Sequence, residues 1–501
     1  MKIYSLRSIP SALFLLLLLG CTSLSPRHVL PIPDSIEGCQ VFFDQLEKQV
    51  EEAGVRDASN FLIPGFPYLR TNRFLAAMKD RIRDERDQEQ WLQWMKTLDL
   101  QAREKEISNL PEDTVRSFQA IKTTQPDRKE FKARVESCSD RLLNRDQASA
   151  EFHAILASRV DVPDEYSFLR RAIGLFPLMV IPVAVVSHKA RVKTRSWYEP
   201  DFDDLPVKGQ LRTYVPRENL SLDDKAVHET MDESRKNPLG VPQPDADQGK
   251  KLALSLAPFL IQDVAAPYDR IGKVSWKGDR LEIGPERPTV YYYFSHAFLK
   301  EKPVLQINYV IWYSERAGES PPSIEKGHLD GLTFRVSLDI QGKPFMWDVM
   351  NNCGCYHFFA PVRERVDRII SRPFKHDPFI PQWLPILPAG KRLGIRINSG
   401  WHQVERLLTA GESTAAIPYE LVPYDILEAL PRENGGTASI FDCRGIAKGS
   451  DRVERFILFS MGIPKIGSMR QRSHHAIELI RRTHFDDPRL FDQNFVFKEA
   501  E

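Results

Sequence analysis

The sequence predicts an α+β protein in which an N-terminal helical domain precedes a β-rich antiparallel domain, sandwich- or barrel-like. Two kinds of apolar spacing predict this order. From about 72 to 158 the chain is highly charged and carries apolar residues at helical spacing, among them Trp91 and Trp94. From about 250 to 465 apolar residues instead alternate, as in Leu305–Tyr313. A hydrophobic content of 42% over 501 residues is typical of a globular protein.

The charge balance limits the classes of partner. The 69 basic and 68 acidic residues leave a net charge of +1. Because nucleic-acid binding depends on an excess of basic residues facing the phosphates, we expect no nucleic-acid partner. The chain contains no Gly-x-Ser-x-Gly motif, no phosphate-binding glycine loop and no dinucleotide fingerprint. The sequence therefore assigns no reaction to this protein.

The first twenty residues are typical of an export signal. Lys2 and Arg7 precede an apolar stretch, Ile9–Gly20, that is too short to span a bilayer. The stretch ends in Leu18-Leu19-Gly20-Cys21. This ending resembles the lipobox of bacterial lipoproteins with a type II signal peptide.

The resemblance implies cleavage before Cys21 and attachment of acyl chains, such as palmitate, to that cysteine. Residues 1–20 are then the signal peptide and residues 21–33 a proline-containing tether. Several acyl chains on one residue give stable anchoring. In this family an Asp after the cysteine favours the inner membrane. Thr22 stands there, so we expect a cell-envelope protein in the outer membrane, facing the periplasm.

Residues 34–165 are expected to form the helical domain. Asp34 with Glu37 predicts a helix start, and Gly54 predicts its end. Cys39 and Cys138 each lie on an apolar stripe with helical spacing, so two facing helices would bring them together. We predict a disulfide between them, which would close a loop of 99 residues. The alternative is two buried free cysteines.

Residues 166–248 are interpreted as an apolar segment and a proline-rich linker. The uncharged stretch Ala172–Val186 contains Pro177 and Pro182 and is expected to be buried or membrane-contacting loop and strand. A short helix is expected at Asp223–Arg235. The β-rich domain then covers 249–465. Residues 466–501 are expected to form a basic helix, Arg470–His484, with a solvated or membrane-facing surface, and a tail.

One hairpin in the β-rich domain suggests a site. Strands Leu332–Ile340 and Phe345–Val349 should pair around Gln341-Gly342. The apolar residues are even-numbered in the first strand and odd-numbered in the second, so only a register that pairs even with odd numbers keeps both apolar rows on one face. This register places Arg335 opposite Asp348 on the outer face.

Extending the same ladder places Asp330 opposite Cys353 and His328 opposite Cys355, with His357 on the same face. These five residues would form a site at one end of the hairpin. Thiolate, imidazole and carboxylate groups suit zinc. His328, Asp330 and a distal His402 also resemble the facial triad of non-haem iron oxygenases, so iron is the alternative metal. The glycines and asparagines near Cys353 favour a bulge or chain reversal instead.

Two other readings of these residues stay open. Cys353 and Cys355 would form a redox pair if a nearby histidine lowers a thiol pKa. Otherwise one of them bridges to Cys443, and His328 is a core histidine bonded to Asp330.

The leading hypothesis for function is a membrane-anchored envelope lipoprotein with a metal or thiol site in its β-rich domain. The competing hypothesis is a non-catalytic envelope lipoprotein held by disulfides. It would bind an envelope protein partner or a carbohydrate through its helical domain and Trp-rich surfaces.

Overall fold

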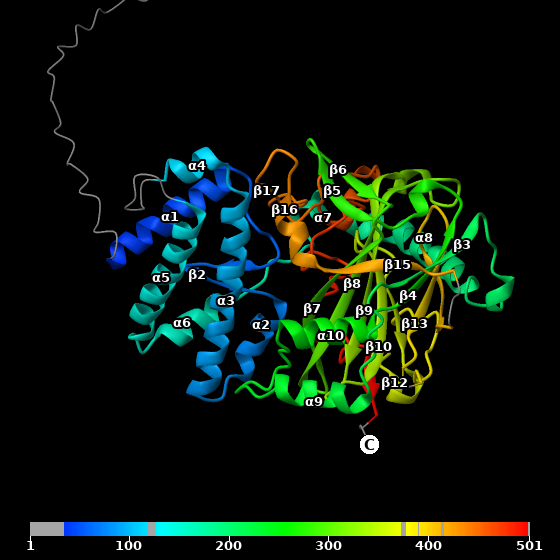
Figure 1. The fold of residues 1–501 in the computed structure, drawn as a ribbon, viewed down its shortest axis with the longest axis horizontal. Helices are drawn as coiled ribbons and strands as arrows, with labels where there is room; N and C mark the ends of the chain where they lie inside the picture. Colours follow the sequence, from blue (N-terminus) through cyan, green and yellow to red (C-terminus); the bar gives the residue numbers. More distant parts are fainter. Residues whose placement is uncertain (1–34, 119–126, 372–376, 389, 412–414, 499–501) are drawn as a thin grey trace, which may run out of the picture.

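The computed structural model describes residues 35–118, 127–371, 377–388, 390–411 and 415–498. The expected signal peptide, Cys21 and the expected tether lie outside the described residues. A helical domain lies beside a domain built on a large curled sheet, which confirms the α+β class (Figure 1).

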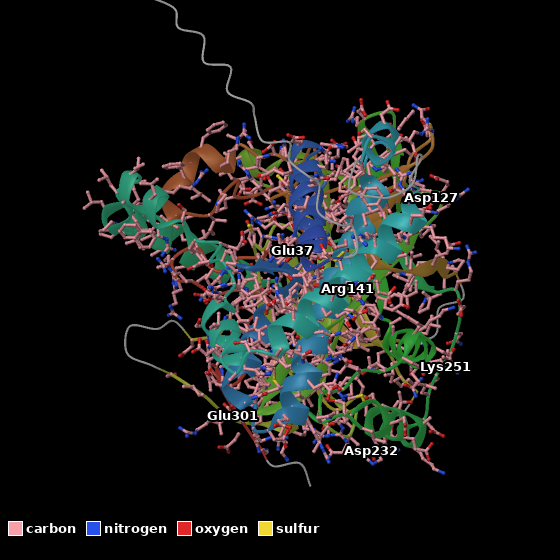
Figure 2. All side chains as sticks on the ribbon, turned by 90° about the vertical axis from the view of Figure 1, so that its left-hand side faces the viewer. Glu37, Asp127, Arg141, Asp232, Lys251 and Glu301 are labelled. Atoms are coloured by element: carbon pink, nitrogen blue, oxygen red, sulfur yellow. A yellow bond between two sulfur atoms is a disulfide. The ribbon has the colours of Figure 1, made fainter. Side chains whose placement is uncertain are left out.

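The helical domain is built on three long helices. Its first helix has Ser35 as N-cap, one residue after the expected start, and Gly54 follows its end with a φ of +64°. Figure 2 views this domain from the side, with Glu37 on the first helix and Arg141 on the third long one. Its elements are α1 (Ile36–Glu52), β1 (Phe61–Ile63), β2 (Phe66–Thr71), α2 (Arg73–Met78), α3 (Glu85–Asn109), α4 (Glu112–Arg116), α5 (Arg128–Gln147) and α6 (Phe152–Arg159).

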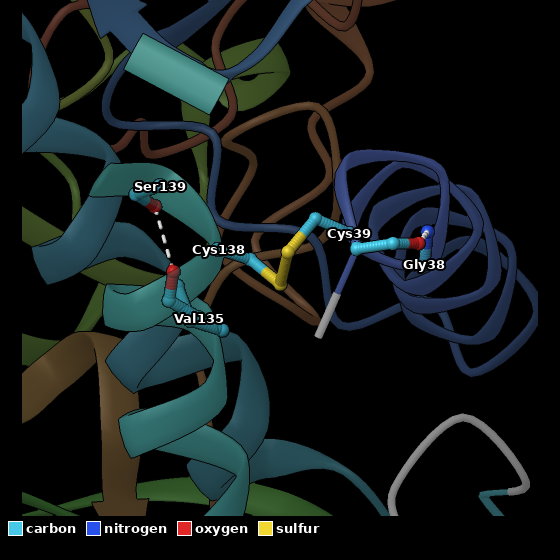
Figure 3. The surroundings of a disulfide bond; sticks show 6 residues. Gly38, Cys39, Val135, Cys138 and Ser139 are labelled. Atoms are coloured by element: carbon cyan, nitrogen blue, oxygen red, sulfur yellow. Dashed lines mark hydrogen bonds between the residues drawn. A yellow bond between two sulfur atoms is a disulfide. The ribbon is translucent and has the colours of Figure 1, made fainter. Parts of the chain in front are cut away.

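A disulfide joins Cys39 of α1 to Cys138 of α5, as the two apolar stripes predict (Figure 3). Both cysteines are fully buried. Phe42 and Phe131 pack together beside the bridge, with ring centroids 6.2 Å apart. The disulfide therefore crosslinks two helices inside the apolar core of the helical domain.

The second domain contains a ten-stranded sheet in the described part of the chain, in the order β11-β10-β9-β8-β7-β15-β3-β4-β13-β14. The sheet is mixed rather than purely antiparallel, because β15 runs parallel to β3 and β7, and β13 runs parallel to β4. Its strands are β3 (Gln210–Pro216), β4 (Phe259–Val264), β7 (Thr289–Leu299), β8 (Lys302–Arg316), β9 (Gly327–Leu338), β10 (Pro344–Asn351), β11 (Phe358–Pro361), β13 (Leu393–Ile397), β14 (Val404–Thr409) and β15 (Ile417–Pro423).

Two short helices cover one face of this sheet, α9 (Asp224–Ser234) and α10 (Ala246–Leu256) (Figure 1). Met231 and Leu252 pack there in one core with the apolar residues of β8 and β9. The Tyr309 hydroxyl of β8 donates a hydrogen bond to the Ala253 carbonyl. Three two-stranded antiparallel sheets complete the described part of the domain: β5 (Lys273–Lys277) with β6 (Arg280–Gly284), β12 (Val366–Ile369) with β18 (Phe495–Phe497), and β16 (Leu430–Pro431) with β17 (Thr437–Ala438).

Residues 166–248 are not only a linker. They supply β3 to the sheet, and the helix expected near Asp223 is present as α9, with Asp223 as its N-cap. The apolar stretch forms helices rather than loop and strand, namely α7 (Phe168–Ile173) and α8 (Phe176–Ser196). Pro177 occupies the first turn of α8, where no backbone donor is needed, and Pro182 is tolerated inside it. None of the described helices is long and apolar enough to cross a membrane.

The expected basic helix Arg470–His484 does not form. The segment is irregular, and tertiary contacts replace helical ones: His474 contacts the Glu165 carboxylate and the Ala58 carbonyl. Arg472 is paired with Asp425 and Glu428. The segment around His474 therefore contacts the helical domain, and Phe485–Phe497 pack in an apolar core with β7, β8 and β10 instead of presenting a solvated helix.

Candidate functional site

The predicted hairpin has the predicted register from Met346 to Asn351, and a bulge shifts the pairing by one residue at Pro344. Arg335 of β9 pairs with Asp348 of β10, and its guanidinium donates to both carboxylate oxygens at 2.9 and 2.6 Å. The pair is buried rather than on an outer face, because the Phe485 ring covers the guanidinium at 3.6 Å. Burial raises the pKa of the Asp348 carboxyl. The Arg335 charge and a hydrogen bond from His357 lower it by more, so the net pKa lies below its usual range.

The five-residue cluster predicted beyond this pair does not form. The β9–β10 ladder ends where Asn351 pairs with Leu332. Gly354 then reverses the chain into β11, with a φ of +87° and a hydrogen bond from its amide to the Asn351 carbonyl. A Cβ at Gly354 would lie 2.4 Å from the Ala476 carbonyl oxygen, so the turn needs glycine. Cys353 and Cys355 therefore lie on a turn and not on the extended ladder.

The predicted metal ligands point to separate partners. His328 bonds the Leu281 carbonyl at 3.0 Å, and its neighbour Leu329 interrupts the strand with a φ of +59°. His357 bonds Asp348 at 3.0 Å, and Asp330 holds the Arg316 guanidinium with both oxygens. Among the described residues, no group of three or more His, Cys, Asp and Glu side chains is placed to hold a metal. The described geometry therefore lends no support to the zinc site predicted from the ladder.

The predicted iron triad fails for the same reason, although two of its members meet. His402 contacts Asp330 through Nδ1 at 2.8 Å and Asp269 through Nε2 at 3.2 Å, so neither ring nitrogen is free for a metal. Its ring is stacked on Tyr313, with centroids 3.8 Å apart. Burial disfavours the imidazolium, but the two carboxylates outweigh burial and raise the pKa of His402. This cluster is fully buried and structural.

The two cysteines of the turn lie in contact as free thiols. The Cys353 thiol is buried, Cys355 is half-buried, and Cys443 is exposed elsewhere. A hydrogen bond from the Cys355 thiol lowers the pKa of Cys353, burial opposes this, and the Arg316 charge lowers the pKa further. The same hydrogen bond raises the pKa of Cys355. The contact therefore lowers the pKa of one thiol and raises that of its neighbour.

Acidic groups around the thiols add to this coupling. Burial raises the pKa of Glu454 to about 8, and the negative charges of Cys353 and Glu325 raise it as well. Glu325 accepts hydrogen bonds from Tyr356 and from the Trp401 indole. The turn thus lies beside a buried carboxyl, Glu454, whose pKa is about 8.

A cavity of about 590 Å³ separates the helical domain from the sheet. This volume lies within the range of small-ligand sites. One wall comes from α2 and α3, the other from β7, β8 and β9, and irregular segments around Pro242 and His475 complete it. The residues that the argument uses are Gln90, Gln93, Trp94, Thr97 and Gln101 on α3, Tyr293 and His296 on β7, Asn308 on β8, and His475.

Amides dominate the helical wall of the cavity. Gln90, Gln93, Thr97 and Gln101 follow each other at intervals of three and four residues, so they share one face of α3. The three glutamine side chains make no hydrogen bond with the described residues. Each therefore presents both a donor and an acceptor to the cavity.

The opposite wall holds two buried acceptors without partners. Oδ1 of Asn308 and Nε2 of His475 have none among the described residues. Burial lowers the pKa of His475 to about 3, with the Arg470 charge adding to the effect, so the imidazole is neutral. Since its other nitrogen bonds the backbone of Asn352, Nε2 carries a lone pair that needs a donor.

The charged side chains at the cavity are paired within the protein. Arg73 donates to Asp486, Arg335 to Asp348, and Arg472 to Glu428. Burial raises the pKa of Asp486, although the Arg73 charge opposes it. The cavity therefore offers neutral hydrogen-bonding groups and aromatic surface rather than a net charge.

Comparisons with protein-family models, with curated proteins and with solved structures gave no match for this chain. Its function must therefore be argued from the site itself.

Sequence reasoning missed the cavity. Its lining comes from segments as distant as Gln93 and His475, which the fold alone brings together. The glutamine stripe on α3 was a usable signal, because uncharged amides at helical spacing are unusual in a segment otherwise rich in charge.

Proposed function

We propose that this protein is a lipid-anchored lipoprotein of the bacterial cell envelope that binds a carbohydrate in the cavity between its two domains. The anchor is argued from the sequence Leu18–Cys21, and the outer membrane from Thr22. One observation carries the binding proposal. The cavity presents glutamine amides that make no hydrogen bond with the described residues, while its charged side chains are already paired inside the protein.

A carbohydrate matches this chemistry better than other small ligands. Sugar hydroxyl groups both donate to and accept from amide groups such as that of Gln93. Trp94 and Tyr293 supply aromatic surface for the apolar face of a sugar ring. An ionic ligand would find no unpaired counter-charge at Arg73, Arg335 or Arg472.

The test uses a chain that begins at Thr22, so that no lipid is attached. We would screen neutral di- to tetrasaccharides by saturation-transfer NMR and measure the affinity of the best one by calorimetry. We expect Gln93→Ala and Gln101→Ala each to weaken binding about three- to tenfold, since each removes about 0.5–1.5 kcal/mol of net hydrogen bonding. The exposed Gln147 at the end of α5 lies outside the cavity, and Gln147→Ala is the matched control.

Either of two results would contradict the proposal. One is that no oligosaccharide in the panel binds. The other is that both cavity variants bind the best oligosaccharide as tightly as the Gln147→Ala control does.

A second candidate function is thiol–disulfide exchange, and the contact between Cys353 and Cys355 supports it. An external disulfide would oxidise both thiols to one disulfide and would itself be reduced to two thiols, so electrons and protons balance. The lowered pKa of Cys353 beside Arg316 favours this exchange.

A further inference from the structure

Helices α7 and α8 form a hairpin whose apolar side chains face away from the protein. Of the seventeen large apolar side chains exposed in the described residues, ten lie between Phe168 and Val192. Phe168 is 76% exposed, and Leu178 and Val186 are 66% and 65% exposed. Within α8, which the structure describes in full, only Val183 and Thr194 are buried. Contiguous apolar exposure on this scale marks a binding surface.

The hairpin is docked, so this exposure is not that of a frayed segment. Arg171 donates hydrogen bonds to the carbonyls of Met461, Leu479 and Ile480. The Ser167 amide donates to the Gly462 carbonyl. At the turn between the helices, a Cβ on Gly174 would lie 2.5 Å from the Ser460 Cα. These contacts hold one side of the hairpin against η7 (Phe459–Met461) and leave the apolar side outward.

A neighbouring helix extends the same surface. Val453, Phe456 and Ile457 lie on or beside α11 (Glu454–Ile457) and are also exposed. The chain runs directly from α11 into η7, against which α7 and α8 pack. In Figure 2 the helical hairpin and the α11 ribbon project together from the upper left of the molecule. We call the exposed apolar residues of α7, α8 and α11 the apolar surface.

The charges on the α7–α8 hairpin have one sign. Residues 167–198 contain six Arg and Lys residues and no Asp or Glu, in a chain whose net charge is only +1. The first half of α8, residues 176–187, carries no charge, and its second half carries Lys189, Arg191, Lys193 and Arg195. At about 1.5 Å per residue the uncharged half is about 18 Å long. That length reaches the acyl boundary of a bilayer but does not cross it.

We propose that the apolar surface inserts into the interface of an anionic phospholipid bilayer, with the basic half of α8 at the level of the phosphates. Charge decides between a bilayer and other occupants, because uniform positive charge beside an apolar helix is the pattern of interfacial membrane helices. A second copy of this chain would bring the same positive charge against it. The proposal depends neither on a lipid at Cys21 nor on the carbohydrate site.

The experiment measures vesicle binding by the chain that begins at Thr22. Every contact described above lies within residues 35–498, so this chain keeps the whole fold. The probes are vesicles of phosphatidylethanolamine and phosphatidylglycerol at 3:1, and vesicles of phosphatidylcholine alone. We expect binding at least tenfold tighter to the anionic vesicles, and weaker binding as salt is raised.

Three variants separate insertion from simple charge attraction. Leu178→Asp and Ile181→Asp should each weaken binding to the anionic vesicles at least tenfold. Lys189→Glu should weaken it less, about threefold, and mainly at low salt. Ile386 is 57% exposed and lies outside α7, α8 and α11, so Ile386→Asp is the matched control and should bind normally. Circular dichroism would verify that each variant is folded.

Two results would overturn the proposal. Equal vesicle binding by Leu178→Asp, Ile181→Asp and Ile386→Asp would show that the apolar surface does not touch lipid. If sedimentation instead shows a dimer that only the two hairpin variants dissociate, while their vesicle binding is unchanged, the surface is a contact between copies of this chain.

Discussion

The molecule holds two pairs of neighbouring cysteines in different surroundings. Cys39 and Cys138 are fully buried in the apolar core of the helical domain and are joined. Cys353 and Cys355 lie on a turn of the sheet domain near Arg316 and remain separate thiols in hydrogen-bonding contact. The first pair connects two long helices, whereas the second pair spans a single glycine.

The difference shows how the surroundings of a thiol decide its chemistry. An apolar core raises the cost of a thiolate, so a pair buried there is suited to a permanent crosslink. A cation near a thiol lowers the cost of forming a thiolate, and the Arg316 guanidinium acts in this way on Cys353. We therefore expect the first pair to contribute stability and the second pair to respond to redox conditions and pH.

The largest expected effect comes from removing the first pair. The double variant Cys39→Ser, Cys138→Ser should lose about 4–5 kcal/mol of unfolding free energy, because its bridge closes a loop of 99 residues. The matched control, Cys353→Ser with Cys355→Ser, should lose about 1 kcal/mol, the usual scale of a single-site change. Urea denaturation measures both. Equal losses would contradict the assigned difference between the two pairs.

Local patterns predicted a large part of the fold. Helical spacing placed Cys39 and Cys138 correctly, because a side chain's position on a helix depends only on its near neighbours. Alternation likewise fixed the register that pairs Arg335 with Asp348. The same logic failed at Cys353, where one glycine turn ended the ladder. A register holds only as far as the strand continues.

Tertiary contacts decided the remaining elements. Pro177 in the apolar stretch favours loop or strand by itself, yet it lies in the first turn of α8, where proline is favourable. The segment around His474 has helical composition, but its side chains find better partners in Glu165 and other distant residues. The cavity depends on residues of both domains, so no local pattern could locate it.

A smaller effect is expected in the pH dependence of stability near the second pair. The pKa of Glu454 is about 8 in the folded protein, above its ordinary value of 4.5. The stability that the protonated Glu454 carboxyl provides is fully present below pH 4.5 and is lost as the pH rises through 8. Wild type should therefore lose up to about 1.4 kcal/mol of unfolding free energy per pH unit over this window relative to Glu454→Gln.

The comparison is made by urea denaturation at several pH values. Because every other titrating group is shared, the difference between the two curves isolates Glu454. The exposed Glu364 provides the control variant Glu364→Gln, which should run parallel to wild type. Parallel curves for Glu454→Gln would mean that Glu454 ionises as an ordinary glutamate.

The smallest effect on stability is expected from oxidising the second pair, because a Cys353–Cys355 bridge closes a loop of only three residues. The change in the mass of the chain is nevertheless distinct. Oxidised glutathione should remove two hydrogens from the chain, and intact-mass spectrometry should place the new bridge at these two residues. Cys443→Ser should oxidise in the same way, since Cys443 is exposed and separate. Cys353→Ser should instead keep a glutathione adduct on Cys355. If the reagent modifies only Cys443, the contact between the two thiols is packing and not a redox site.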